Sequence, residues 1–303
     1  MYKRMLVPLD GSEVAESVFP YARELAGRLG TEVVLLHIAN PALKDFQPMT
    51  RAYVDHAADL VRKGLPGEKP VLVHGELVVG YPADEILKYA DENKIDLIMV
   101  ASHGRSGRGR WHIGSVAERV LRSASVPVLL VQTGVSEQIS FESWPVIELV
   151  VPLDGSELAE SVLSHVEALS TPGGSVPLKV VLVRACEPPS MPTYYSPELS
   201  EIPLHWGQYA QQETDRCKQM SAEYLTNIEQ RLKASKIDVR SEILQGKASD
   251  EIVNYANKNP YSIIVMATHG RSGLSRLVYG SVALNILVGV STPIFLVKPM
   301  VKQ

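Results

Sequence analysis

Residues 96–131 of the chain read DLIMVASHGRSGRGRWHIGSVAERVLRSASVPVLLV. The first apolar run, Leu97–Ala101, is short and bounded, which is typical of a strand buried on both faces of a sheet. A loop rich in glycine and basic residues follows, and then a helical pattern over Ser115–Ser123 and a second apolar strand over Val126–Val131. This order of strand, loop, helix and strand predicts part of a parallel α/β fold.

The loop between the first strand and the helix has the chemistry of an anion site. Gly104 and Gly114 let the backbone come close to a ligand, and we expect Ser115 to cap the helix. The N–H groups of the first helical turn and the positive end of the helix dipole would then face the loop. The stretch therefore predicts a site for a phosphate group.

The same pattern occurs a second time. Residues 262–297 read SIIVMATHGRSGLSRLVYGSVALNILVGVSTPIFLV. Earlier in the chain, Leu6–Glu13 returns as Val150–Glu157, and Gly80–Ile86 returns in looser form as Gly246–Ile252. Such internal repetition predicts a duplicated fold.

The repeats also indicate where the two copies differ. The offset between them grows from 144 residues at Asp10 and Asp154 to 166 residues at Gly104 and Gly270, so the second copy carries 22 additional residues. The stretch Gln132–Glu148 has no periodicity and joins the copies. We predict two homologous domains, over residues 1–135 and 146–303.

Composition limits the class of protein. Of 303 residues, 45% are hydrophobic and 21% are charged, which is typical of a soluble globular protein. A net charge of −4 gives no overall attraction to nucleic acid or to an anionic membrane, and no apolar run reaches the roughly 18 residues of a membrane span. We expect no secretory leader, and we interpret Cys186 and Cys217 as core or surface filling in a reducing compartment, the cytoplasm.

Strands alternate with helices along each copy. In the first copy we predict strands over Arg4–Pro8, Glu32–Ile38, Val71–Val78, Leu97–Ala101 and Val126–Val131, and helices over Ser12–Leu29, Met49–Lys63, Pro82–Asn93 and Ser115–Ser123. In the second copy a strand over Val180–Arg184 precedes the proline-rich stretch Glu187–Trp206 and a long helix over Gln208–Ala234. The stretch is interpreted either as a surface insertion or as a ligand lid. Alternation of this kind predicts doubly wound parallel sheets, with ligands at the carboxyl ends of the strands.

Several common site motifs are absent from the sequence. It contains no GxxxxGK[ST], no GxGxxG, no GxSxG and no His, Cys and acidic cluster with zinc spacing. These absences argue against a Walker-type NTPase, a dinucleotide-dependent dehydrogenase, an α/β-hydrolase and a zinc enzyme.

The glycine loops resemble the nucleotide signature of the universal stress protein family, G-x2-G-x9-G-[ST]. Ala101-Ser102-His103-Gly104 is followed by nine residues and Gly114-Ser115, and Ala267-Thr268-His269-Gly270 by nine residues and Gly280-Ser281. The VPLDGS opening and the final SVPVLLV strand are also similar to that family. In both copies alanine replaces the first glycine. We expect binding to survive this change, because a single Cβ narrows the ribose–phosphate side without removing an N–H donor.

The resemblance implies the fold and the ligand. The fold would be two tandem Rossmann-like (adenine nucleotide alpha hydrolase-like) domains, each a doubly wound five-stranded parallel sheet. The ligand would be ATP, with ADP and AMP as alternatives and with Mg²⁺ accompanying the nucleotide. The expected ATP-binding residues are Pro8, Leu9, Asp10, Ile38, Val100, Ala101, His103, Gly104, Arg105, Gly114, Ser115 and Val116, and in the second copy Pro152, Leu153, Asp154, Ala185, Met266, Ala267, His269, Gly270, Arg271, Gly280, Ser281 and Val282.

Some of these residues have two interpretations. Asp10 and Asp154 are expected to accept hydrogen bonds from nucleotide hydroxyl or amine groups, or to help place Mg²⁺; otherwise each caps the following helix. Arg105 would reach a phosphate or lie in a solvated loop. His103 is expected to support the loop through backbone contacts rather than act as a base, because no partner acid or nucleophile is placed near it. No catalytic residue and no resident metal site is predicted.

The favoured function is that of a stress-response ATP-binding protein, a sensor or switch read by an unknown protein partner. One alternative is an enzyme, a slow Mg²⁺-dependent ATPase or phosphoryl-transfer enzyme, and another is a nucleotide-free interaction scaffold. Neither nucleic acid nor membrane is expected as a partner. Members of the family usually pair through their last strands. The resemblance therefore implies that Val126–Val131 and Ile294–Val297 pair within one chain as an intramolecular pseudo-dimer, which would hide two strand edges. Dimers of whole chains stay open.

Overall fold

The first half of the chain forms one α/β unit in the computed structural model. The structure describes residues 2–41, 47–66, 70–104, 113–133, 144–170, 172–190, 206–268 and 279–298. The strands of the first half are β1 (Arg4–Leu9), β2 (Glu32–Ala39), β3 (Val73–Val79), β4 (Leu97–Ala101) and β5 (Val128–Val131). Its helices are α1 (Glu13–Glu16), α2 (Phe19–Leu29), α3 (Gln47–Lys63), α4 (Pro82–Glu92) and α5 (Ser115–Ser123).

The second half repeats this order of elements. Its strands are β6 (Ile147–Pro152), β7 (Leu178–Cys186), β8 (Val239–Gln245), β9 (Ser262–Ala267) and β10 (Ile294–Val297). Its helices are α6 (Glu157–Glu160), α7 (Leu163–Leu169), α8 (Trp206–Ala234), α9 (Ala248–Lys258) and α10 (Ser281–Gly289). The predicted doubly wound α/β class is confirmed, and strand and helix ends differ from the prediction by a few residues. The domain limits at residues 135 and 146 stay a prediction, because residues 134–143 lie outside the described part of the chain.

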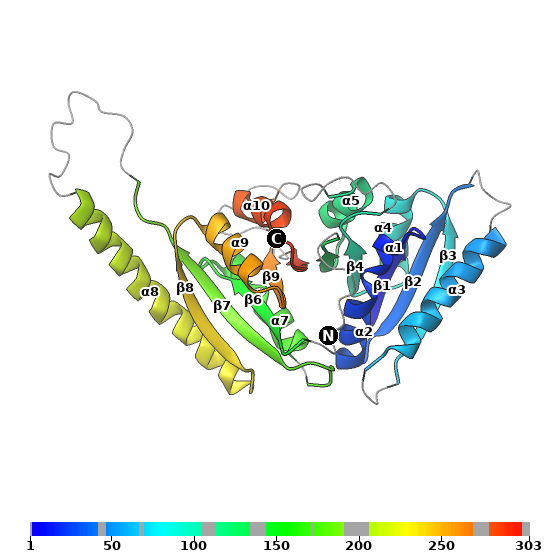
Figure 1. Ribbon diagram of the computed structural model, residues 1–303, viewed down its shortest axis with the longest axis horizontal. Coiled ribbons are helices and arrows are strands. Elements are labelled where there is room, and N and C mark those ends of the chain that lie inside the picture. Colours follow the sequence, from blue (N-terminus) through cyan, green and yellow to red (C-terminus); the bar gives the residue numbers. More distant parts are fainter. Residues whose placement is uncertain are drawn as a thin grey trace, which may run out of the picture.

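The two halves share one sheet with the strand order β3-β2-β1-β4-β5-β10-β9-β6-β7-β8. Pairing is parallel within each half, and β5 and β10 meet antiparallel, with Phe295 opposite Leu129. The predicted pairing of the last strands within one chain is confirmed, and it leaves β3 and β8 as the edges of the sheet. In Figure 1, α3 and α8 lie at opposite outer ends of the molecule, beside these edge strands.

The first long helix of each copy is interrupted. Instead of one helix over Ser12–Leu29, the structure has α1 and α2, separated at Ser17 and Val18. Pro20 lies at the start of α2. Proline has no N–H, and its ring would clash with the carbonyl of the fourth residue before it, which favours the break in the first copy. The second copy has the same break between α6 and α7 with Ser164 at the matching position, so proline is not its general cause. The C-terminal end of the predicted helix agrees with the structure, because α2 ends at Leu29 and Gly30 caps it with φ of 69°.

The core has two layers, one on each face of the sheet. Alternate residues of β1 divide between them: Met5, Val7 and Leu9 belong to one layer and Leu6 to the other. Each layer contains buried residues from both halves of the chain. The duplicated halves therefore bury their apolar surface together.

An aromatic cluster joins the two halves. The ring of Tyr2 lies 6.0 Å from that of Phe295 on β10 in an edge-on arrangement. Its hydroxyl lies 2.5 Å from Nδ1 of His165 on α7. Burial raises the pKa of Tyr2 and lowers the pKa of His165, which keeps both side chains neutral near pH 7.

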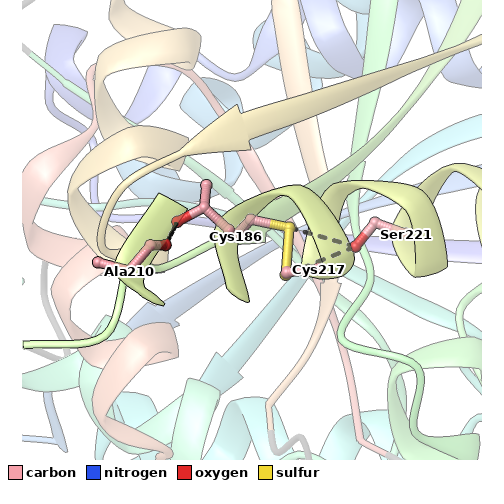
Figure 2. Close-up of a disulfide and its surroundings, with 5 residues drawn as sticks. Cys186, Ala210, Cys217 and Ser221 are labelled. Carbon is pink, nitrogen blue, oxygen red and sulfur yellow. Dashed lines mark hydrogen bonds between the residues drawn. A yellow bond between two sulfur atoms is a disulfide. The ribbon is translucent and has the colours of Figure 1, made fainter. Parts of the chain in front are cut away.

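The two cysteines form a disulfide, so their interpretation as filling residues was wrong. Cys186 ends β7 and Cys217 lies on α8, with 5.9 Å between their Cα atoms (Figure 2). The sequence separation of 31 residues concealed the pair, since only the tertiary fold brings α8 against the end of β7. Within the part of the chain that the structure describes, no helix is both long and apolar enough to cross a membrane.

Candidate functional site

The carboxyl ends of β1, β2 and β4 and the start of α5 surround a cleft of about 800 Å³. It lies at the switch point of the first half, where β1 is flanked by β2 on one side and β4 on the other. The structure brings these predicted residues together as lining residues: Pro8, Leu9, Asp10, Ile38, Val100, Ala101, His103, Gly104, Gly114, Ser115 and Val116. Arg105 lies outside the described residues.

The loop before α5 closes on itself through the backbone. The N–H of Gly114 donates to the carbonyl of Ser102 at 2.8 Å, and the N–H of Glu118 donates to the carbonyl of Gly114 at 2.8 Å. Gly114 is therefore the N-cap of α5, without a side-chain cap, and Ser115 is its first helical residue. The expectation that Ser115 caps the helix was wrong, because the loop closes one residue earlier. The first-turn N–H groups have no intrahelical acceptor, and they lie where Ser115, Val116 and Ala117 line the cleft.

Asp10 supports the turn between β1 and α1. Its Oδ1 accepts from the N–H of Ser12 at 3.0 Å and from the Ser12 hydroxyl at 2.6 Å. Ser12 in turn caps α1 by accepting from the N–H of Ala15, so the cap is not Asp10 itself. The second oxygen of Asp10 faces Gly104, where an added Cβ would overlap it. The carboxylate is thus held against the loop, on the wall of the cleft.

His103 is tied to hydroxyl groups. Its Nδ1 lies 3.1 Å from the Ser102 hydroxyl and 3.2 Å from the Thr133 hydroxyl. The two hydroxyls are 3.1 Å apart, and the Ser102 oxygen also accepts from the N–H of Thr133 at 3.0 Å. The side chain links the loop to the end of β5, which agrees with a supporting role. These contacts of the ring run to side-chain hydroxyls, and the expected backbone contacts stay a prediction.

Sequence reasoning missed about half of the lining. The additional residues are Gly11, Ala15, His37, Ala39, Asn40, Met49, Thr50, Tyr53, Pro82, Ile86, Ser102 and Ala117. Tyr53 is the most informative of them: its hydroxyl donates to Oε1 of Glu16 at 3.0 Å and its ring lies edge-on to His37, 6.0 Å between centroids. A tyrosine–glutamate bond of the same kind occurs in the second copy, but it joins residues 64 positions apart and no local sequence pattern marked it.

The second copy repeats the backbone frame of this cleft. The N–H of Gly280 donates to the carbonyl of Thr268 at 3.2 Å, and α10 starts from Gly280 as α5 does from Gly114. Asp154 accepts from the N–H and hydroxyl of Ser156 at 2.9 and 2.6 Å. Pro152, Leu153 and Asp154 lie at the end of β6, Ala185 in β7, Met266 and Ala267 at the end of β9, and Ser281 and Val282 open α10. His269, Gly270 and Arg271 lie outside the described residues.

One side chain distinguishes the second copy. Arg184 of the second half corresponds to His37 of the first half. In strand pairing His37 lies opposite the residue after Pro8, and Arg184 lies opposite the residue after Pro152. The guanidinium of Arg184 lies over the ring of Tyr224, 4.8 Å from its centroid. Its Nη1 would be 3.1 Å from a Cβ on Gly155, whose φ is +85°. A permanent cation therefore replaces a histidine beside the turn that follows the first strand.

The tyrosine under this cation is held in place by α6. Its hydroxyl donates to Oε1 of Glu160 at 2.9 Å. Burial, followed by this hydrogen bond, raises the pKa of Tyr224, so the phenol stays protonated. In the first copy Tyr53 and Glu16 make the matching contact.

Comparison with known proteins gives a consistent result. The model of the universal stress protein family matches residues 1–132 and 148–298. Universal stress protein MJ0531 of Methanocaldococcus jannaschii is 30% identical over 141 residues, which cover 44% of this chain and 83% of the relative. Universal stress protein Slr1230 of Synechocystis is 22% identical over 320 residues, which cover 96% of this chain and 98% of the relative. The crystal structure of a universal stress protein from Archaeoglobus fulgidus, 18% identical, has the same fold, with a TM-score of 0.64 over 97% of this chain and 96% of that one.

Proposed function

Because the chain belongs to the universal stress protein family, we propose that it is a stress-response protein that binds ATP in the cleft of each half and acts as a nucleotide-dependent switch. The cytoplasm is the proposed location. A partner protein would read the difference between the nucleotide-bound and nucleotide-free states. Such a switch requires that the nucleotide bind one conformation more tightly than the other.

The phosphate end of the ligand is assigned to the loop and α5. The first-turn N–H groups of α5 and the positive end of its dipole favour an anion at this point of the cleft. At Gly104 the missing Cβ lets the Asp10 carboxylate lie against the loop, and at Gly114 it lets the loop close on the carbonyl of Ser102. These features lie on the wall of the same cleft as Asp10, opposite the end of β2.

The base and ribose are assigned to the strand ends. Ile38 and Val100 supply apolar surface for a base, and the adjoining Asp10 carboxylate is an acceptor for ribose hydroxyls or an exocyclic amine. A cleft of about 800 Å³ falls within the range of ligand pockets of about 300–1,000 Å³. Apolar walls with a few placed polar groups are the usual composition of such sites.

Magnesium would enter with the nucleotide. Within the described residues there is no group of three or more His, Cys, Asp or Glu side chains placed to hold a metal ion. Mg²⁺ keeps several waters and is commonly held by one or two carboxylates together with the substrate's phosphates. Asp10 is the carboxylate that lines the cleft, and Mg²⁺ would add positive charge beside the phosphates.

A switch is preferred over a catalyst because of His103. Phosphoryl transfer needs a group that positions a water or an acceptor. His103 lies in the loop itself, and its Nδ1 is engaged by Ser102 and Thr133. Its geometry is that of a support for the loop.

The single observation that carries the proposal is that the first turn of α5 opens into the same cleft as Asp10 and Ile38. The test begins with nucleotide content: purified protein is denatured, and adenine nucleotide in the supernatant is counted per chain by liquid chromatography and mass spectrometry. Mg-ATP titration by calorimetry follows on nucleotide-free protein. Two sites per chain are expected.

Matched variants assign the sites. Gly114→Asp and Gly280→Asp each place a carboxylate at the N-terminus of α5 or α10, and each is expected to remove one of the two sites by charge repulsion. Gly207→Asp is the control, since nothing lies within 4 Å of a Cβ at that position. Protein that purifies without nucleotide and binds no Mg-ATP would overturn the proposal. Release of ADP from bound ATP at a steady rate would replace the switch with an enzyme.

A further inference from the structure

The disulfide lies at the carboxyl end of the sheet in the second half. Cys186 is the last residue of β7 and is fully buried, while Cys217 is partly exposed on α8. Figure 2 shows the bond bridging the strand end and the helix, with Ser221 beside it. The Ser221 hydroxyl lies 3.4 Å from Sγ of Cys186 and 4.0 Å from Sγ of Cys217.

The backbone shows which position of the first half Cys186 occupies. The N–H of Gly246 donates to the carbonyl of Cys186 at 2.9 Å, and the N–H of Gly80 donates to the carbonyl of Ala39 at 3.1 Å. Cys186 therefore corresponds to Ala39, and Ala39 lines the cleft of the first half. One partner of the disulfide thus occupies a lining position of the repeated fold.

The helix side shows the same relationship. The matching tyrosine–glutamate bonds align Tyr224 of α8 with Tyr53 of α3. Three residues earlier on each helix, Ser221 then corresponds to Thr50, which also lines the first cleft. The disulfide therefore joins a strand position that matches the lining residue Ala39 to α8, one turn before the position that matches the lining residue Thr50.

We propose that Cys186 and Cys217 form a reversible redox site that controls the second cleft through thiol–disulfide exchange with low-molecular-weight thiols. In the oxidised state the bond holds α8 against the end of β7, and in the reduced state the outer part of α8 separates from the strand. The proposed location is the cytoplasm, where disulfides are usually transient and redox-sensing. The effect on the ligand rests on the proposed function, whereas the effect on α8 does not.

The exchange balances without a metal or cofactor. A thiolate attacks Sγ of Cys217, the more exposed sulfur, and the bond to Cys186 breaks. The Cys186 sulfur leaves as a thiolate, and Ser221 is placed to donate a hydrogen bond to it. A second thiolate attacks the mixed disulfide at its small-molecule sulfur and releases Cys217. The sum is one protein disulfide and two thiols giving two protein thiols and one small-molecule disulfide, a transfer of two electrons.

The outer part of α8 depends on this bond. Among residues 206–216, which precede Cys217, Thr214 alone is buried. Farther along the helix, Ser221, Leu225 and Leu232 are buried against the sheet. Segments with few buried contacts open at low cost in free energy. Breaking the disulfide is therefore expected to release residues 206–220 while the remainder of α8 stays packed.

The first test measures thiols and backbone exchange in the full-length protein. It is equilibrated in glutathione buffers of graded ratio, free thiols are counted by maleimide mass shift, and amide hydrogen exchange is followed. Reduction is expected to speed exchange of residues 206–220 at least ~10-fold. Residues 47–63 of α3 are the internal control, because both cysteines of the chain lie in the second half. Cys217→Ser should show the fast exchange in every buffer.

The second test measures Mg-ATP affinity at the second site in a Gly114→Asp background. The affinity is expected to change at least ~5-fold between oxidised and reduced protein, and to be insensitive to glutathione in Cys217→Ser. A disulfide that resists ~10 mM reduced glutathione, or an α8 whose exchange is unaffected by reduction, would overturn the proposal. Measurable binding with equal affinity in both states would also overturn it. Absence of Mg-ATP binding in both states with a responsive α8 would refute nucleotide binding at the second site and leave the redox site standing.

Discussion

The carboxylate of Glu24, on α2 of the first half, accepts a hydrogen bond from the backbone N–H of Ser175 in the second half, with 2.9 Å between N and Oε2. Arg28, one turn farther along α2, pairs with the other oxygen at 2.6 Å and donates to the carbonyl of Val176 at 2.6 Å. The two side chains are only 3% and 4% exposed. A charged pair that is buried in this way ties one half to the other.

Removing one member of this pair should destabilise the protein strongly. Glu24→Ala removes the carboxylate that pairs with the buried Arg28 charge, and we expect the free energy of unfolding to fall by about 3–5 kcal/mol. Urea denaturation followed by circular dichroism measures the loss. Asp55→Ala is the control, because Arg51 and Asp55 are about half exposed and should contribute less than about 1 kcal/mol. Equal effects of the two substitutions would show that the interdomain pair contributes no more than a surface pair.

The contact between Gly104 and Asp10 can be tested by adding one carbon. In Gly104→Ala the new Cβ overlaps Oδ2 of Asp10, so the loop or the carboxylate must move. We expect the affinity of the first site for Mg-ATP to fall at least ~10-fold, or about 1.4 kcal/mol. Calorimetry on the Gly280→Asp background isolates this site. Gly207→Ala is the control and should bind Mg-ATP as the parent does, because a Cβ there meets nothing within 4 Å. Unchanged Mg-ATP affinity in Gly104→Ala would show that the loop does not contact the ligand.

The Tyr2–His165 contact predicts a dependence of stability on pH. Burial lowers the pKa of His165, so the native state resists protonation and the unfolded state takes up the proton first as pH falls below about 6.5. Stability is therefore expected to decrease as pH falls from 6.5, with a slope approaching about 1.4 kcal/mol per pH unit from this residue. Urea midpoints at several pH values, for the parent and for His165→Asn, measure that part. A slope that is the same in both proteins would assign the pH dependence to other groups.

The disulfide should also contribute to stability, apart from any role as a switch. The Cys186–Cys217 bond closes a separation of 31 residues, for which loss of chain entropy in the unfolded state predicts about 3–4 kcal/mol. Cys217→Ser, or the parent in excess reductant, should lose that amount in urea unfolding. Adding reductant to Cys217→Ser should have no further effect. A variant as stable as the oxidised parent would show that α8 is held equally well without the covalent bond.

Much of the fold was predictable because its signals are local and occur twice. The buried run Leu97–Ala101 has the predicted limits, since a short apolar segment between polar residues has few alternatives to a central strand. The pairing of β5 with β10 was expected from the family resemblance, and the hiding of two strand edges is its physical reason. The break between α1 and α2 was not predicted. Apolar residues continue at helical spacing on both sides of Pro20, and this periodicity indicated one continuous helix.

The candidate site was predictable only along its strand ends and its glycine loop. Gly104 and Gly114 lie in the spaced glycine motif and Asp10 lies in the VPLDGS opening, and the structure places all three on one cleft. Tyr53 and Thr50 come from α3, whose sequence shows only an amphipathic helix. Their place in the lining depends on how α3 rests against the sheet, which no local pattern encodes. The ligand roles of all these residues stay predictions until binding is measured.

By itself the sequence determined the duplication, the alternation of strands and helices and the position of the glycine loops. Repeated motifs indicate the duplication, and periodicity and turn residues within short segments indicate the elements and loops. Only the tertiary structure decided that Cys186 meets Cys217, that Glu24 meets Ser175 and that Arg184 lies over Tyr224. These contacts join residues 31 to 151 positions apart. They depend on the packing of whole helices against the sheet, which is a collective property of the two apolar layers and not of any single segment.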